Sequence, residues 1–488
     1  MISLRTILPG IFGLTLLAGC TTSEELLSVT ATDAGFAKVS ATTYEALGQD
    51  AVWVRDRQQA QTLSERVRAL VVGKTVSADA AVQVALLNNK GLQAAYAEIG
   101  IAAADVWQEM LLPNPVVSIG VLGIAHPELG AFRAIEGMVA NNILALATRR
   151  RRVEIADVKF QSAQLAAALE TLRLAAETRR AWVTAVAAFE TAAYLNQAQV
   201  AADAASELAQ RLGETGALPK RGQAREHAFF AELTGQRAQA RLAAQLAKEE
   251  LTRLMGLWGA DVDYFIPDYL PRLPKRPATG VDVEREALVR RVDLQIAKLA
   301  LDAEAKDYGL TEATRLVSDL ELIAGFEAER ELEAGDIKTI VTPQLEIEFV
   351  IPIFDSGKAR QRKAELAYMR AASRLAEKAV NVRSEARAAY NDLLGRYDIA
   401  RHYQNSVLPL RVTIEEESLL TYNGMITNTF ELLADTRAKV NTILLSTNAR
   451  RDFWLADINI NTAVYGGGGA GAPAGSDMNV ADAGGGGH

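Results

Sequence analysis

Apolar and acidic residues alternate along the segment that runs from Leu345 to Phe354. Every odd position in this segment is apolar, whereas Glu346 and Glu348 occupy even positions. Side chains of a strand point alternately to its two faces, so the pattern predicts a strand with one apolar face and one acidic face. The upstream segment Ser318–Ala328 repeats the pattern, and a charged hairpin loop separates the two. The acidic positions of both segments are Asp319, Glu321, Glu327, Glu346 and Glu348.

Two such strands, each of about ten residues, match the wall of a transmembrane barrel, with lipid on the apolar face and water on the acidic face. We expect strands within about 115–147 in the first half of the chain and within about 316–354 in the second half. A half-buried sheet of a soluble protein would show the same alternation and is the alternative. Four strands do not close a barrel, and hydrocarbon does not tolerate an open sheet edge, so a membrane sheet would require several chains.

Helical spacing dominates the rest of the chain. No Gly or Pro interrupts Thr148–Leu212, and about 65 helical residues would extend roughly 100 Å. The second half has a similar run from Lys358 to Leu408, in which Gly395 is the weak point. Helices of this length without internal caps predict a coiled coil or a helical barrel.

Each long helix is expected to turn at a tip and return as a second helix. The two tips are expected at about 211–221 and about 420–428, where glycine interrupts the helical pattern. Glycine accepts a positive φ without steric cost, so it permits a tight turn. The tip glycines are Gly213, Gly216 and Gly424.

The two halves of the chain echo each other. The sequence ALLNNKGLQ at 85–93 returns as ALVRRVDLQ at 287–295. Each half is expected to begin with a single helix of roughly 35 residues, followed by two strands and a long helical hairpin. The expected domains are a first repeat at 76–264, an extended Pro-rich linker at 265–280 and a second repeat at 281–465.

The start of the chain has the features of an export signal. A short apolar run ends in LAGC, and it is too short to span a bilayer. We expect a lipoprotein signal peptide at 1–19, lipidation of Cys20, and a lipid-anchored extension at 20–75. An ordinary secretory signal with an unrelated cysteine is the alternative. The Gly-rich tail at 466–488 lacks the apolar residues needed to pack and is expected to be disordered.

Composition limits the possible functions. The net charge of -8 and the sequence pI near 5.4 do not favour nucleic-acid binding. The four histidines are scattered without metal-ligand spacing, and neither a nucleophile elbow nor a phosphate loop is present. The sequence therefore predicts neither an enzyme nor a cofactor or metal site.

Several motifs, in their order along the chain, resemble the TolC-like outer-membrane efflux channels, specifically the lipoprotein branch that serves tripartite pumps. These motifs are the lipobox at Cys20, LPNPVVSIG at 112–120, VIPIFDSGKARQRKAELAY at 350–368 and TYNGMITNTFELLADTRAKV at 421–440. The resemblance implies a mainly α-helical homotrimer with a membrane β-barrel of twelve strands and a long periplasmic α-helical barrel. It also implies that the tips contact a periplasmic adaptor of an inner-membrane pump.

Two acidic residues near the second tip are candidates for a gate. Glu431 and Asp435 lie one helical turn apart, so they share a face. In the resembled family, acidic rings constrict the periplasmic end of the tunnel. The alternative is a solvated helix face on which these residues pair with Arg437 or Lys439. In the twelve-stranded barrel that the resemblance implies, the acidic strand positions would line the lumen and favour cations.

These observations predict a passive exit channel, lipid-anchored in the outer membrane and extending into the periplasm, that conducts small molecules or ions from a tripartite efflux pump. One alternative is the outer-membrane duct of a type I protein secretion system. Another is a periplasmic coiled-coil scaffold that forms no pore. The four arginines at 149–152 begin a long helix, where they contact either phosphate headgroups or solvent. The transported substrate does not follow from the sequence.

Overall fold

The structure is a computed structural model that describes residues 31–468, apart from 32, 217, 278–281, 334–335 and 425–428. The expected signal peptide at 1–19, Cys20 and the tail beyond 468 lie outside the described residues. The chain divides into two compact units. Unit 1 comprises residues 1–41, 94–167 and 294–378, and unit 2 comprises 42–93, 168–293 and 379–488.

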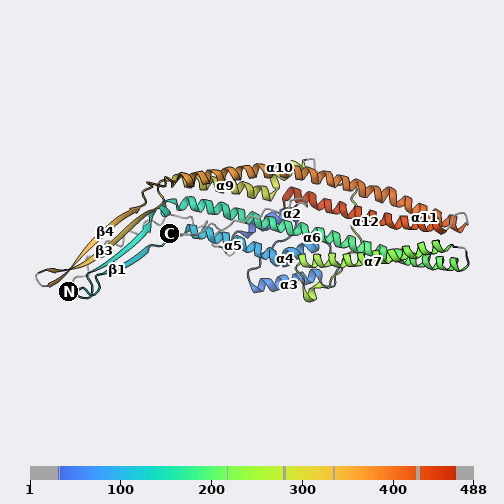
Figure 1. The fold of residues 1–488 in the computed structure, drawn as a ribbon, viewed down its shortest axis with the longest axis horizontal. Coiled ribbons are helices and arrows are strands. Elements are labelled where there is room, and N and C mark those ends of the chain that lie inside the picture. The colour runs from blue at the N-terminus through green and yellow to red at the C-terminus, as the bar shows by residue number, and fades with distance from the viewer. Residues whose placement is uncertain are drawn as a thin grey trace. The chain divides into compact units, whose positions relative to one another are not determined.

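Unit 1 contains a four-stranded antiparallel sheet (Figure 1). Its strands are β1 (Val116–Leu122), β2 (Ala134–Asn142), β3 (Leu320–Glu333) and β4 (Asp336–Phe349), paired in the order β1-β2-β3-β4. β2 ends at Asn142 because the Asn142 side chain accepts a hydrogen bond from the Ala145 backbone at 2.7 Å and begins a helix. β4 ends at Phe349, shortly before Pro352, which has no N–H to donate to a ladder.

Each strand pair is preceded by two helices rather than by the single long helix that the sequence predicted. These helices are α4 (Ala78–Asn88) and α5 (Lys90–Met110) in the first half, and α8 (Val283–Arg290) and α9 (Val292–Ala313) in the second half. The breaks fall at Asn89 and Arg291, which have extended ψ angles of 121° and 117°. Both residues stand at the same place in the echoed segments, so the sequence echo corresponds to a shared backbone break.

The helix that follows β2 is α6 (Ile143–Glu214), which has 72 residues, and α7 (Lys220–Leu254) returns beside it (Figure 1). In the second half, α10 (Lys358–His402) leads through a π-helical segment (Tyr403–Val407) to α11 (Leu408–Asn423), and α12 (Thr429–Tyr465) returns. Gly395 does not interrupt α10. The irregular segment lies directly before Pro409, because a proline clashes with the carbonyl four residues earlier and a wider turn relieves that clash.

The expected N-terminal extension contains two helices, α2 (Phe36–Leu47) and α3 (Arg57–Val71), which the sequence interpretation missed. The Asp56 carboxylate caps α3 by accepting a hydrogen bond from the Gln59 backbone at 2.7 Å. Val67 and Val71 are buried in the main core of unit 2. The Trp182 indole donates to the Val76 carbonyl at 2.8 Å within the same core.

The described part of the expected Pro-rich linker, residues 265–277, is fixed at several points in unit 2. Glu190 of α6 is fully buried, and its carboxylate accepts a hydrogen bond from the Leu270 backbone at 3.1 Å and pairs with Arg450 of α12. The Trp454 indole donates to the Pro271 carbonyl, and the Tyr397 hydroxyl donates to the Pro274 and Lys275 carbonyls. This segment therefore joins α6, α10 and α12 through hydrogen bonds.

Candidate functional site: a two-faced sheet and two helical hairpins

The pairing register sorts the residues of the sheet into two faces, because residues directly opposite each other share a face. Leu320 pairs with Phe349, Leu322 with Ile347, and Ala324 with Leu345. The same face continues across β1 and β2, and its large apolar side chains are Val117, Ile119, Val121, Ile135, Val139, Leu320, Leu322, Phe326, Leu332, Ile337, Val341, Leu345, Ile347 and Phe349. Most of them are exposed, and Leu345 is 72% exposed. The apolar strand face that the sequence predicted therefore extends over four strands.

The opposite face carries the predicted acidic residues of the strands. Glu321 stands directly opposite Glu348, and Glu346 stands opposite Ile323. Glu327 pairs with Glu136 of β2, which the sequence interpretation missed because the alternation in that strand is weak. Two carboxylates directly opposite each other repel, so this face requires water or cations beside it.

Two amides support this acidic face. The Asn142 amide donates to the Asp319 carboxylate at 2.9 Å, so Asp319 is held at the end of the sheet beside the start of α6. The Gln344 amide donates to the Glu327 carboxylate at 3.2 Å. The five predicted acidic residues therefore lie along β3, β4 and the residue that precedes β3, and they do not form one compact cluster.

Two glycines bring β2 and β3 close together. A Cβ on Gly325 would lie 2.4 Å from the Gly137 carbonyl oxygen, and a Cβ on Gly137 would lie 2.9 Å from the Phe326 ring. A side chain at either position would force the strands or the ring to move. Glycine at both positions therefore allows the backbones of β2 and β3 to approach closely.

The three predicted tip glycines have different roles. Only Gly216 has a positive φ, +73°, so it alone uses the conformation expected for a tip turn. A Cβ on Gly213 would lie 1.8 Å from the Gln223 side chain, so this glycine leaves room for contact between α6 and α7. Gly424 has φ -78° and caps α11 without a left-handed conformation. Gly213 and Gly424 therefore do not use the positive φ that glycine permits, because their backbones remain in or near helical conformations.

The gate candidates lie at the start of α12. The Asp435 carboxylate accepts a hydrogen bond from the Ser418 hydroxyl of α11. Arg437 forms an ion pair with the buried carboxylate of Glu226 on α7 at 2.9 Å, and Lys439 pairs with Glu415 of α11. The alternative interpretation paired Arg437 and Lys439 with Glu431 and Asp435. In the structure these two cations form ion pairs with residues of α7 and α11.

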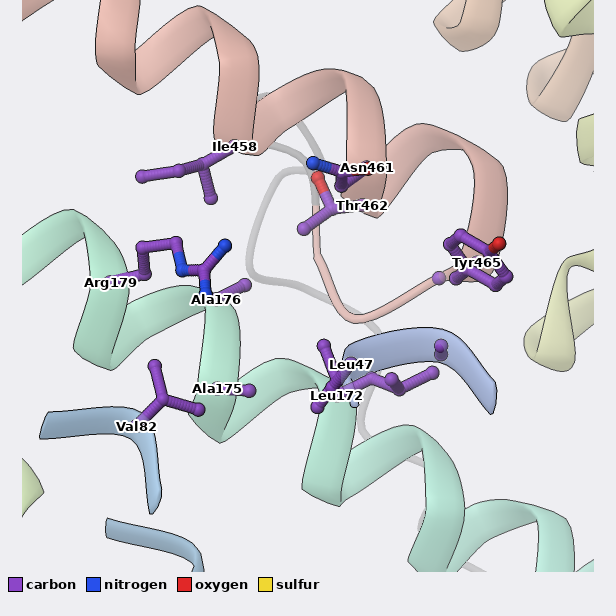
Figure 2. Close-up of a pocket in the computed structure, with 12 residues that line it drawn as sticks. Leu47, Val82, Leu172, Ala175, Ala176, Arg179, Ile458, Asn461, Thr462 and Tyr465 are labelled. Carbon is purple, nitrogen blue, oxygen red and sulfur yellow. The ribbon is translucent and has the colours of Figure 1, made fainter. Parts of the chain in front are cut away.

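A small cavity of about 260 Å³ lies in unit 2 between the end of α2, α4, α6 and α12 (Figure 2). Its wall is mostly apolar, and Figure 2 shows Ile458 of α12 and Ala176 of α6 among the residues that line it. Arg179 at its rim pairs with Asp79. The cavity is smaller than a typical ligand site and contains none of the predicted functional residues, so it does not define the function.

Within the described ranges, no helix is both long enough and apolar enough to cross a membrane. No group of three or more His, Cys, Asp or Glu side chains in the described part of the chain is placed to hold a metal ion.

No protein-family model matches the sequence, and no curated protein matches it. Solved structures do match the fold. The outer-membrane channel OprN aligns over 88% of this chain and 95% of its own, with 18% identity and a TM-score of 0.64. The CmeC outer-membrane channel of Campylobacter jejuni aligns over 86% and 89%, with 16% identity and a TM-score of 0.66. The outer-membrane protein VceC of Vibrio cholerae aligns over 80% and 96%, with 15% identity and a TM-score of 0.63.

At these identities the likeness defines the fold. The chain has the fold of TolC-like outer-membrane channels, the class that its motifs resemble. OprN and CmeC are outer-membrane channels.

Proposed function

We propose that this protein is a passive outer-membrane exit channel of a tripartite efflux pump and that it acts as a homotrimer. The observation that carries the proposal is the sheet with an exposed apolar face and an acidic face, in a chain with the fold of outer-membrane channels. Lipid would cover the apolar face, and the acidic face would line a water-filled lumen.

The edges of the sheet support a multimeric barrel. Among the described strands, β1 and β4 are the edge strands of the sheet. An unpaired edge cannot persist in hydrocarbon, because no water is present to satisfy its backbone groups. Three copies would bring β1 of one chain beside β4 of the next and close a twelve-stranded wall.

The long helices of unit 2 also expose apolar side chains that a neighbouring chain would cover. Val380 of α10, Leu410 and Leu420 of α11, and Leu246 of α7 are each more than half exposed. Such residues on long helices fit the walls of a helical barrel better than a fully solvated hairpin. The two-repeat organisation, with repeats at 76–264 and 281–465, would place four long helices per chain in that barrel.

The remaining parts of the proposal concern the partners of the channel. Lipidation at Cys20 would anchor each chain in the outer membrane, and the tips with Gly213, Gly216 and Gly424 would contact a periplasmic adaptor of an inner-membrane pump. Glu431 and Asp435 would form an acidic constriction near these tips. The duct of a type I secretion system would share all of these features, whereas a scaffold without a pore would leave the exposed apolar sheet face without an occupant.

Conductance in planar bilayers tests the proposal. The detergent-purified protein should migrate as a trimer that dissociates on heating, and it should form conducting pores. Glu431→Ala should raise single-channel conductance because it removes three charges from the narrow end. Glu249→Ala is the matched control, because Glu249 is an exposed residue of α7 away from the tips.

Recovery of the mature chain as a soluble monomer without detergent would contradict the channel. Conductance that Glu431→Ala leaves unchanged would remove this residue from the gate.

A further inference from the structure

All four connections between the sheet and the helices lie at one end of the sheet. β1 and β3 begin at this end, and β2 and β4 finish there, because Val116 pairs with Ala140 and Leu320 pairs with Phe349. The connections expose a group of apolar side chains, called here the collar. Its members are Leu111, Leu112, Leu316, Val317, Val350, Ile351, Ile353 and Phe354, each between 41% and 100% exposed.

Positively charged residues stand at the start of α10, separated from the collar by Asp355, Ser356 and Gly357. This cationic row consists of Lys358, Arg360, Arg362 and Lys363, and all four are exposed. Arg362 pairs with Glu365 at 2.7 Å. Among the described residues, no carboxylate lies within 4 Å of the Lys358 or Lys363 ammonium group. The first turn of α10 contains no acidic residue, and the Asp355 carboxylate that precedes it accepts a hydrogen bond from the Gly357 backbone at 2.8 Å.

The backbone fixes the row beside the collar. Gly357 has φ +70° and lies against Arg315, where a Cβ would approach the Arg315 carbonyl oxygen to 2.4 Å. The Arg360 guanidinium donates to the same carbonyl at 3.4 Å. Arg315 immediately precedes Leu316, so the β3 and β4 sides of the collar meet at the first turn of α10.

The arginines at 149–152 are engaged differently. The Arg149 guanidinium donates to the Met110 carbonyl at the end of α5, at 2.9 Å. Arg152 pairs with Glu109 at 3.3 Å. These contacts bind the first turns of α6 to α5, so this group is the weaker candidate for headgroup contact.

We propose that the collar and the cationic row together form a binding surface for the anionic headgroups of a phospholipid bilayer. Apolar side chains would enter the acyl boundary, and the lysines would extend along it to contact phosphate oxygens. The inference rests on the proposed function, because the collar borders the sheet that is proposed to cross the membrane. Charge complementarity favours this occupant over a second copy of the surface, which would bring the same positive charge.

Thermal unfolding of the full-length protein in detergent tests this surface. Phosphatidylglycerol should raise Tm more than phosphatidylcholine at equal concentration, and 0.5 M NaCl should reduce the difference by screening. The double variant Lys358→Gln/Lys363→Gln should bind phosphatidylglycerol more weakly. The lipid concentration that gives half of the maximal Tm increase should rise about fivefold for each lysine replaced. Lys159→Gln/Lys298→Gln is the matched control, because both of these lysines are exposed on α6 and α9.

An equal response of the control pair and the test pair would overturn the proposal, as would equal responses to the two lipids. A similar Tm increase with inorganic phosphate alone would show simple anion binding and would also overturn it. Conductance of each variant in phosphatidylcholine bilayers distinguishes failure of the proposed lipid surface from failure of the proposed channel function. Pores that show no phosphatidylglycerol effect would contradict the lipid surface only, whereas absence of pores would contradict the proposed function.

Discussion

At the scale of single residues, the carboxyl of Asp457 on α12 carries an electrostatic cost. Burial raises the pKa of its carboxyl above the ordinary value of 3.8, and the charge of Arg179 only partly opposes this effect. A raised pKa means that the native state disfavours the charged carboxylate relative to the unfolded chain. At neutral pH, where both states are ionised, Asp457 therefore lowers the free energy of unfolding.

Asp457→Asn should thus be more stable than the wild type at pH 7. As the pH falls through the raised pKa of Asp457, the native wild type takes up a proton before the unfolded chain does, so its stability rises relative to the variant. The advantage of the variant should shrink between neutral pH and about pH 4. Denaturant unfolding at several pH values in detergent measures this, and an advantage that is constant with pH would contradict it.

Only part of the residue-level picture could be predicted from sequence. Alternation along one strand is local, so the acidic face of β3 and β4 was predictable. The pairing of Glu327 with Glu136, and the contact of Arg450 with buried Glu190, join residues far apart in the chain. No local pattern indicates such partners, because they depend on strand register and helix packing.

At the scale of elements, two glycines differ in the space around them. A Cβ on Gly395 in α10 would meet no atom within 4 Å, whereas a Cβ on Gly325 in β3 would lie 2.4 Å from the Gly137 carbonyl oxygen. Alanine in an open helical position reduces the entropy that the chain loses on folding. In β3, the Cβ of an alanine at position 325 would collide with the backbone of β2.

Gly395→Ala should therefore raise the free energy of unfolding by about 0.5–1 kcal/mol. Gly325→Ala should lower it by about 1–3 kcal/mol, because β2 and β3 must separate. Denaturant unfolding of both variants under one set of conditions checks the contrast. Destabilisation by Gly395→Ala would show that this face of α10 is covered in the assembled protein.

Apart from the missed helices α2 and α3, the kinds of elements and their order followed from hydrophobic periodicity, which is a local property. The breaks at Asn89 and Arg291 did not, because their sequences are compatible with continuous helix. The Asn89 amide donates to the Leu254 carbonyl at 3.0 Å, so a distant carbonyl at the end of α7 helps to hold the break. The alternation of apolar and polar positions is less regular at about 115–147 than at about 316–354.

At the scale of the whole molecule, the central claim is that the acidic sheet face lines a pore shared by three chains. The fold was predictable because the motifs stand in one order over most of the sequence, and solved outer-membrane channels have this fold. The assembly is a separate inference. It depends on the two edge strands and on the exposed apolar face, which only the register makes visible.

Reversal potential under a salt gradient tests this claim most directly. The protein in planar bilayers should prefer cations, because the glutamates of β3 and β4 would face the proposed lumen. The preference should fall in Glu321→Gln/Glu346→Gln/Glu348→Gln and persist in the exposed control Glu249→Gln. A preference for anions would show that the two faces of the sheet are assigned backwards, and absence of any conductance would contradict the pore itself.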